Sequence, residues 1–203
     1  MLNVSKYVLM GSSSNFGNMF SMAGAALILP FLPMLPIQIL LNNLIYNVSE
    51  IAIPFDNVDP ESVTGPVKWD VRLIERFMLV FGPISSIFDF LTFYAMLRLF
   101  GAAEALFQTG WFIESMTTQI LVVFCIRTRR RLFRSRPGRF LIGTTVGAVA
   151  VALALSLLPP GRWFGFVPPP PVFFVFLVGV TIAYLALVEV AKALFYRVWR
   201  KAR

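Results

Sequence analysis

The side chains most able to do chemistry in this chain are amides and carboxylates that interrupt long apolar stretches. Asn43, Tyr46, Asn47 and Glu50 recur at positions i, i+3, i+4 and i+7, so they share one face of a helix. Burying an amide in lipid without a partner costs about 2 to 7 kcal/mol. Polar groups inside a membrane therefore have partners or mark the path of an ion or a proton.

A second polar face lies in the preceding apolar stretch. Ser14, Asn15 and Asn18 fall within one helical turn, so they also share a face, which we expect to point into a helix bundle. The two stretches are consecutive and would form neighbouring helices of a hairpin. The sequence therefore predicts that the two polar faces lie opposite each other.

Two further carboxylates fall near the middle of later apolar stretches, Asp89 and Glu114. A charge at mid-bilayer costs about 2.5 kcal/mol or more. Two interpretations remain open for both residues. Each is either a protonated or hydrogen-bonded strut between helices, or part of a site for an ion or a proton.

The elements that must position these residues are membrane helices. The chain has 203 residues, of which 58% are hydrophobic and 14% charged, a composition that excludes a water-soluble domain. Its apolar stretches do not alternate in polarity as barrel strands do, so we expect an all-α membrane protein, a six-helix bundle in one domain, residues 1–203. A span needs about 20 residues, and windows of that size lie at about 7–29, 35–54, 74–100, 107–126, 140–158 and 172–196.

Basic residues predict the orientation of the chain. Seven arginines lie in the loop 127–139, and more basic residues follow in the C-terminal tail. By the positive-inside rule, this loop, the loop 55–73 and both termini face the cytoplasm. Basic runs also bind nucleic-acid phosphates, but beside membrane spans the formal net charge of +8 fits topology and contact with lipid headgroups. We expect a lipid bilayer and no nucleic acid as partner.

Other polar residues carry simpler interpretations. Asp56 and Asp59 lack the later glutamate of a calcium-binding EF-hand loop, so we expect a solvated turn. Glu189 and Lys192 are expected to form a surface ion pair. Cys125 is the single cysteine and the chain has no histidine, which excludes a disulfide within the chain and most zinc sites.

Short motifs follow one another along the chain: Ser13-Ser14-Asn15-Phe16-Gly17-Asn18, Leu32 to Gln38, Asn43-Leu44-Ile45-Tyr46-Asn47, Ile53-Pro54-Phe55-Asp56, Gly82 to Asp89, and Phe107 to Phe112. In this order they resemble the C-terminal membrane region of bacterial magnesium-transporting P-type ATPases. The resemblance runs from Asn3 to about Arg139 and then weakens to a hydrophobic pattern. It implies that the six spans are the fifth to tenth of ten helices in a bacterial plasma membrane.

The resemblance also implies a site for a transported Mg²⁺ ion. Asn15 and Asn18 match positions of the fifth helix, and Asn43, Tyr46 and Asn47 match positions of the sixth. Oxygen ligands suit Mg²⁺, which keeps several waters and takes few protein ligands. The family usually has an aspartate where this chain has Asn47, and losing that charge weakens attraction for a divalent ion. Glu50, Asp89 and Glu114 are possible auxiliary carboxylates.

The catalytic part of such a pump is not in this sequence. The family forms an aspartyl phosphate in an Asp-Lys-Thr-Gly-Thr motif that this chain lacks. We therefore expect ATP to act only through domains that the chain does not contain, with no hydrolysis by the chain alone. A second polypeptide carrying the first four helices and the ATPase domains is the partner that this implies.

Three functional hypotheses follow. The first is the C-terminal cation-translocation module of a magnesium-transporting P-type ATPase. The second is a membrane remnant or interaction protein that does not transport, which the Asn47 departure favours. The third is a small cation transporter or channel that works without ATP, although the first three spans do not echo the last three as an inverted repeat would.

Overall fold

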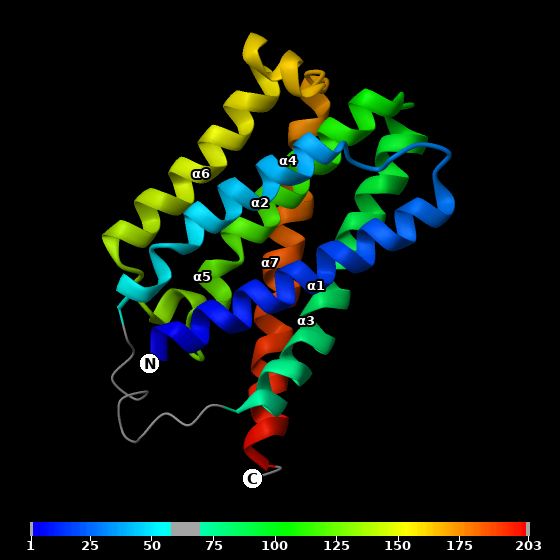
Figure 1. The fold of residues 1–203 in the computed structure, drawn as a ribbon. Helices are drawn as coiled ribbons and strands as arrows, with labels where there is room; N and C mark the ends of the chain where they lie inside the picture. The colour runs from blue at the N-terminus through cyan, green and yellow to red at the C-terminus, as the bar shows by residue number, and fades with distance from the viewer. Residues whose placement is uncertain (1, 58–69, 202–203) are drawn as a thin grey trace.

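The polypeptide folds into a bundle of long helices, which Figure 1 shows in a computed structural model. The structure describes residues 2–57 and 70–201, and these are helical or irregular, with no β-strand among them. The long helices are α1 (Leu2–Ile28), α2 (Pro36–Glu50), α3 (Val71–Tyr94), α4 (Glu104–Leu121), α6 (Arg139–Leu157) and α7 (Pro171–Lys201). The predicted class, an all-α six-helix bundle, is confirmed.

The long helices run back and forth between two ends of the bundle. One end holds both termini of the described chain and the segment that links α4 to α6 (Figure 1). That segment contains the short helix α5 (Val123–Ile126) and a 3₁₀ turn, Leu132–Arg134. The opposite end holds the links from α1 to α2, from α3 to α4 and from α6 to α7. Exposed arginines of the α5–α6 link therefore lie at the same end as the termini.

Helix α4 occupies the centre of the bundle. Every residue from Phe107 to Ile120 is buried, and α4 contacts α2, α3, α6 and α7. Large rings fill the space around it: the Trp111 ring packs edge-on against Phe93 at 4.8 Å between centroids, and Phe112 lies 4.6 Å from Phe166. Because α4 is buried on all sides, its polar residues must find partners inside the protein.

Helices α1 and α3 cross closely at two glycines. A Cβ atom on Gly17 would lie 3.1 Å from the Gly82 carbonyl oxygen and 3.2 Å from the Ser85 Cβ. The Ser86 hydroxyl donates to the Gly17 carbonyl at 3.0 Å. Small residues at a crossing allow the backbones to approach, as is common between membrane helices. Pro83 follows directly, within α3, and the helix continues past it.

The outward face of α7 is apolar. In α7, Phe173, Leu177, Tyr184 and Val188 are buried at helical spacing, while Val175 on another face is 74% exposed. Among the residues that the structure describes, four helical segments are long and apolar enough to cross a membrane: Val71–Leu99, Glu104–Ile126, Arg139–Leu157 and Pro171–Val198. Helix α2 has 15 residues, and α1 carries the polar residues around Ser14. Six membrane spans therefore remain a prediction.

Asp56 is buried and ion-paired, so the expectation of a solvated turn there is wrong. Arg127 donates to its carboxylate at 2.6 Å, the Gly138 main-chain N–H donates at 3.0 Å, and Lys6 lies 3.3 Å away. The side chain of Asp56 is fully buried, and that of Arg127 is 2% exposed. This group, the Asp56 hub, joins the start of α1, the 3₁₀ turn Ile53–Phe55 that follows α2, and the α5–α6 link. Asp59 and most of the loop 55–73 lie outside the described residues.

Lys192 is also buried, which corrects the expectation of a surface pair with Glu189. Its ammonium donates to the Glu189 carboxylate at 2.7 Å and to the carbonyl oxygens of Cys125 and Arg130, each at 2.8 Å. Three acceptors match the three protons of the group. The lysine therefore joins α7 to α5 and to the start of the α5–α6 link.

Candidate functional site

The polar faces of α1 and α2 meet at the end of the bundle that holds the N-terminus. A Cβ atom on Gly11 would lie 3.6 Å from a Glu50 carboxylate oxygen. One turn further along, the Tyr46 hydroxyl interacts electrostatically with Ser14 and Glu50, although none of its contacts among the described residues has hydrogen-bond geometry. Small residues on α1 thus allow Tyr46 and Glu50 of α2 to pack closely against it.

The neighbouring asparagines lie beside this contact on exposed helix faces. Asn15 follows Ser14, and Asn47 follows Tyr46; both are exposed, as is Asn43 one turn along α2. We call Asn15, Asn18, Asn43 and Asn47 the asparagine flank. The expectation that these faces lie wholly inside the bundle is wrong for Asn15, Asn43 and Asn47, because no element within the described chain covers them. Only Tyr46 and Glu50 of the α2 stripe are buried.

Asn18 differs from the other asparagines because it has a partner in the centre of the bundle. Its Oδ1 accepts a hydrogen bond of 2.5 Å from Gln119 Nε2 on α4. Gln119 also donates to the Ser115 hydroxyl one turn earlier on α4. The side chain of Asn18 is half-buried. The asparagine flank is therefore joined to the buried interior through one amide pair.

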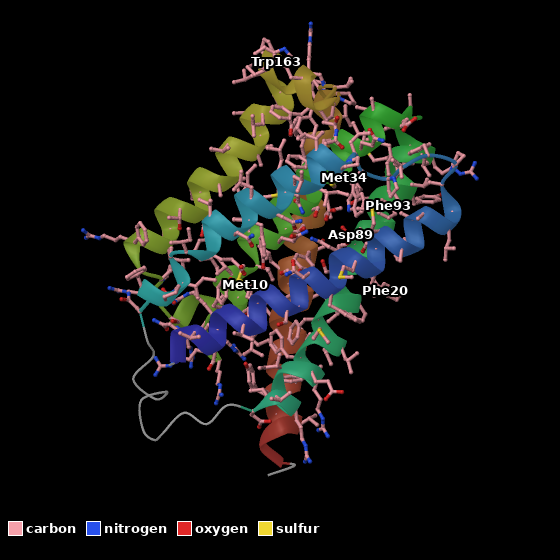
Figure 2. All side chains as sticks on the ribbon, viewed as in Figure 1. Met10, Phe20, Met34, Asp89, Phe93 and Trp163 are labelled. Atoms are coloured by element: carbon pink, nitrogen blue, oxygen red, sulfur yellow. The ribbon has the colours of Figure 1, made fainter. Side chains whose placement is uncertain are left out.

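Asp89 and Glu114 are brought together in the middle of the bundle. Asp89 is 2% exposed and Glu114 is fully buried, and their side chains interact. Asp89 Oδ2 accepts from the Ser21 hydroxyl at 2.5 Å, and Oδ1 accepts from Trp111 Nε1 at 2.9 Å. Figure 2 shows Asp89 well inside the bundle, away from both ends.

Sequence reasoning missed several residues of this interior. Ser21 follows Asn18 by three positions, so it lies on the same face of α1, and its hydroxyl donates to Asp89. The spacing in the sequence was enough to place Ser21 on that face. Gln119 follows Ser115 by four positions on α4, and that pairing could also have been read from the sequence. Asn42 is buried at 6% exposure whereas Asn43 is exposed. Spacing alone could not show which of these two adjacent asparagines turns inward.

The ligand chemistry of the asparagine flank is that of amide oxygens. The described residues contain no cluster of three or more histidine, cysteine, aspartate or glutamate side chains that could hold a metal ion. At the flank itself a cation would meet amide oxygens and water, and Glu50 lies one turn beyond Asn47 on α2. Mg²⁺ accepts such a shell, since it usually keeps several of its waters.

Sequence comparison gives the class to which this helical membrane bundle belongs. Residues 31–194 match the family described as cation transporting ATPase, C-terminus. The chain belongs to this family, and it is a multi-pass membrane protein.

The chain is also similar to magnesium-transporting ATPases, P-type 1, from two bacteria. It is 44% identical over 200 residues to the protein of Escherichia coli (strain K12). It is 42% identical over 200 residues to that of Salmonella typhimurium (strain LT2). Each alignment covers 96% of this chain and 22% of the relative. The chain thus spans about a fifth of the length of the curated relatives that it matches.

Proposed function

We propose that this chain is the C-terminal cation-translocation module of a Mg²⁺-transporting P-type ATPase. The observation that carries the proposal is the asparagine flank. Exposed amides on two neighbouring helices of a membrane protein are costly if they face lipid. Their exposure is explained if a further helix covers these amides and a cation passes between that helix and α1 and α2.

The proposal also needs a negative charge near the flank to attract a divalent ion. Asn47 supplies an amide oxygen and no negative charge, so the nearest carboxylate for a divalent ion is Glu50, one turn further along α2. Glu50 is 2% exposed and has an oxygen without a hydrogen-bond donor among the described residues. A buried carboxylate with free lone pairs attracts a cation more strongly than one in water. In this proposal Glu50 compensates for Asn47.

The partner that completes the site carries the helices that precede this domain and the domains that bind ATP. It is either an earlier part of the same polypeptide or a separate polypeptide, and ATP acts only through it. The basic end of the bundle lies in the cytoplasm of a bacterium by the positive-inside rule. The transported ion crosses the plasma membrane beside α1 and α2.

Reconstitution tests this proposal. The chain would be placed in proteoliposomes alone, and together with a polypeptide that ends just before the fifth helix of a magnesium-transporting P-type ATPase. We expect Mg²⁺-stimulated ATP hydrolysis only when both are present and co-purify. The Asn43→Leu variant should lower this activity without preventing co-purification. ATP hydrolysis by the chain alone would contradict the proposal.

A second function, a membrane interaction protein that does not transport, is favoured by one observation. The asparagine flank is exposed but carries no carboxylate of its own, so it could bind a helix by hydrogen bonds alone. The same reconstitution separates the two functions. Co-purification without any Mg²⁺ flux or ATP hydrolysis, in wild type and in an Asn47→Asp variant, would support the second.

A further inference from the structure

The carboxyl groups of Asp89 and Glu114 form a pair that the asparagine flank does not include. Asp89 comes from α3 and Glu114 from α4, and the two interact in the interior at 2% and 0% exposure. Two ionised carboxylates that lie close together repel each other, and burial removes the water that would screen them. The state of this pair therefore depends on what lies around it.

Donors to Asp89 account for both of its oxygens. The Ser21 hydroxyl of α1 donates to one oxygen at 2.5 Å, and the Trp111 indole N–H of α4 donates to the other at 2.9 Å. Hydrogen bonds to both oxygens stabilise a carboxylate in its ionised form. Asp89 is thus the member of the pair that is prepared to carry a negative charge.

Glu114 has the opposite surroundings. No donor on the described chain reaches either of its carboxyl oxygens. Thr118 is close, but its hydroxyl proton goes to the main-chain carbonyls of Glu114 at 2.9 Å and Ser115 at 3.2 Å. The Glu114 side chain also interacts with Asp89, which is itself an acceptor. Two carboxyl groups form a hydrogen bond only when one of them carries a proton.

The groups that face the pair from other elements are neutral. They are the Ser21 hydroxyl of α1 and the Tyr184 hydroxyl of α7, which interacts with both carboxyls, and the Trp111 indole of α4 is neutral as well. Within the described residues, the lysines and arginines in ion pairs bind Asp56 and Glu189 instead. A positive side chain therefore does not balance the pair there.

We propose that Asp89 and Glu114 form a proton-binding site, in which Glu114 holds one proton and donates it to an ionised Asp89. One proton removes the repulsion and supplies the donor that Glu114 lacks. Mg²⁺ fits this position poorly, because it requires a near-octahedral shell of about six oxygens. Around Asp89 that space is taken by an indole N–H and a hydroxyl proton.

This proton site does not rest on the proposed function, since it uses neither the asparagine flank nor a partner. Its link to α1 is Ser21, which lies one turn from Asn18 on the same helix. A shift of α1 relative to α3 would break the donation from Ser21 to Asp89. Without that donor the ionised form of Asp89 would be less stable, and the preference of the proton for Glu114 over Asp89 would decrease.

Infrared spectroscopy of the full chain in lipid nanodiscs at neutral pH tests the site. A protonated carboxyl gives a C=O stretching band that ionised carboxylates lack, and the band shifts in heavy water. We expect such a band in the wild type and its loss in Glu114→Gln. Asp89→Asn should keep the band at a shifted frequency, because Glu114 remains buried without another donor. Circular dichroism would check that each variant is folded.

Glu50→Gln is the matched control, because Glu50 is also a buried carboxyl but lies at the end of α2. It should leave the band that is sensitive to Glu114 unchanged. Two results would overturn the proposal. One is that the wild-type spectrum has no protonated-carboxyl band, or has only bands that remain in Glu114→Gln. The other is a band that disappears when Mg²⁺ alone is added, which would show a metal in place of the proton.

Discussion

Gln119 on α4 donates a hydrogen bond of 2.5 Å to the Oδ1 atom of Asn18 on α1. This bond joins residues 101 positions apart in the chain and connects the asparagine flank with the buried centre. The orientation of Asn18 therefore depends on α4 as well as on its own helix.

Replacing Gln119 with leucine should destabilise the fold by about 1 to 3 kcal/mol, the cost of leaving a buried polar group without its partner. Thermal unfolding in detergent, followed by circular dichroism, would measure the effect. Thr144→Val is the control, because the Thr144 hydroxyl bonds only carbonyls of its own helix among the described residues. Equal melting temperatures for the two variants would contradict a structural role of the amide pair.

Breaking the Asp56 hub should have a larger effect. Asp56→Asn removes the charge that Arg127 and Lys6 share, and leaving one partner of a buried ion pair uncompensated costs about 3 to 5 kcal/mol. The same unfolding measurement would detect this loss. Glu75→Gln, at an exposed position of α3, should change stability by less than about 0.5 kcal/mol. A comparable loss in both variants would show that the hub has no special role.

The crossing of α1 and α3 predicts that Gly17→Ala is destabilising. The new methyl group would meet the Gly82 carbonyl oxygen at 3.1 Å, so the two helices would have to separate. Gly143→Ala is the control, since a Cβ atom there meets nothing within 4 Å, and alanine favours a helix over glycine by about 1 kcal/mol. We expect a lower melting temperature for the first variant and an equal or higher one for the second. The reverse order would refute the close crossing.

Restoring a negative charge on the asparagine flank should strengthen divalent cation binding. In Asn47→Asp, a carboxylate replaces an exposed amide beside Tyr46, and attraction between opposite charges increases where water is partly excluded. We expect Mg²⁺ affinity to rise at least about tenfold, or about 1.4 kcal/mol, in calorimetric titrations of the reconstituted complex. Asn47→Leu keeps a similar side-chain size without the charge and should weaken binding. No difference between these variants would exclude Asn47 from the ion path.

Composition and apolar length predicted the helical membrane fold, and mid-span position predicted that Asp89 and Glu114 need partners. Helical spacing showed which residues share a face, but it could not show which neighbour covers that face. The exposure of Asn43 and Asn47 was not predicted for this reason. The ion pair of Asp56 with Arg127 links positions 71 residues apart, and such a contact depends on the three-dimensional path of the chain. The burial of Lys192 was missed for the same reason, because two of its acceptors are main-chain carbonyls of Cys125 and Arg130, more than 60 residues earlier in the chain.

The burial of α4 on all sides limits what a further helix can contact. A helix from a partner can reach the asparagine flank or the lipid-facing surfaces, but it cannot reach Glu114 without displacing α1, α3 or α7. The carboxyl pair is therefore complete within this domain and needs no further helix to enclose it. A further helix can cover the exposed amides of the asparagine flank, but it leaves the contacts in the interior of the bundle unchanged.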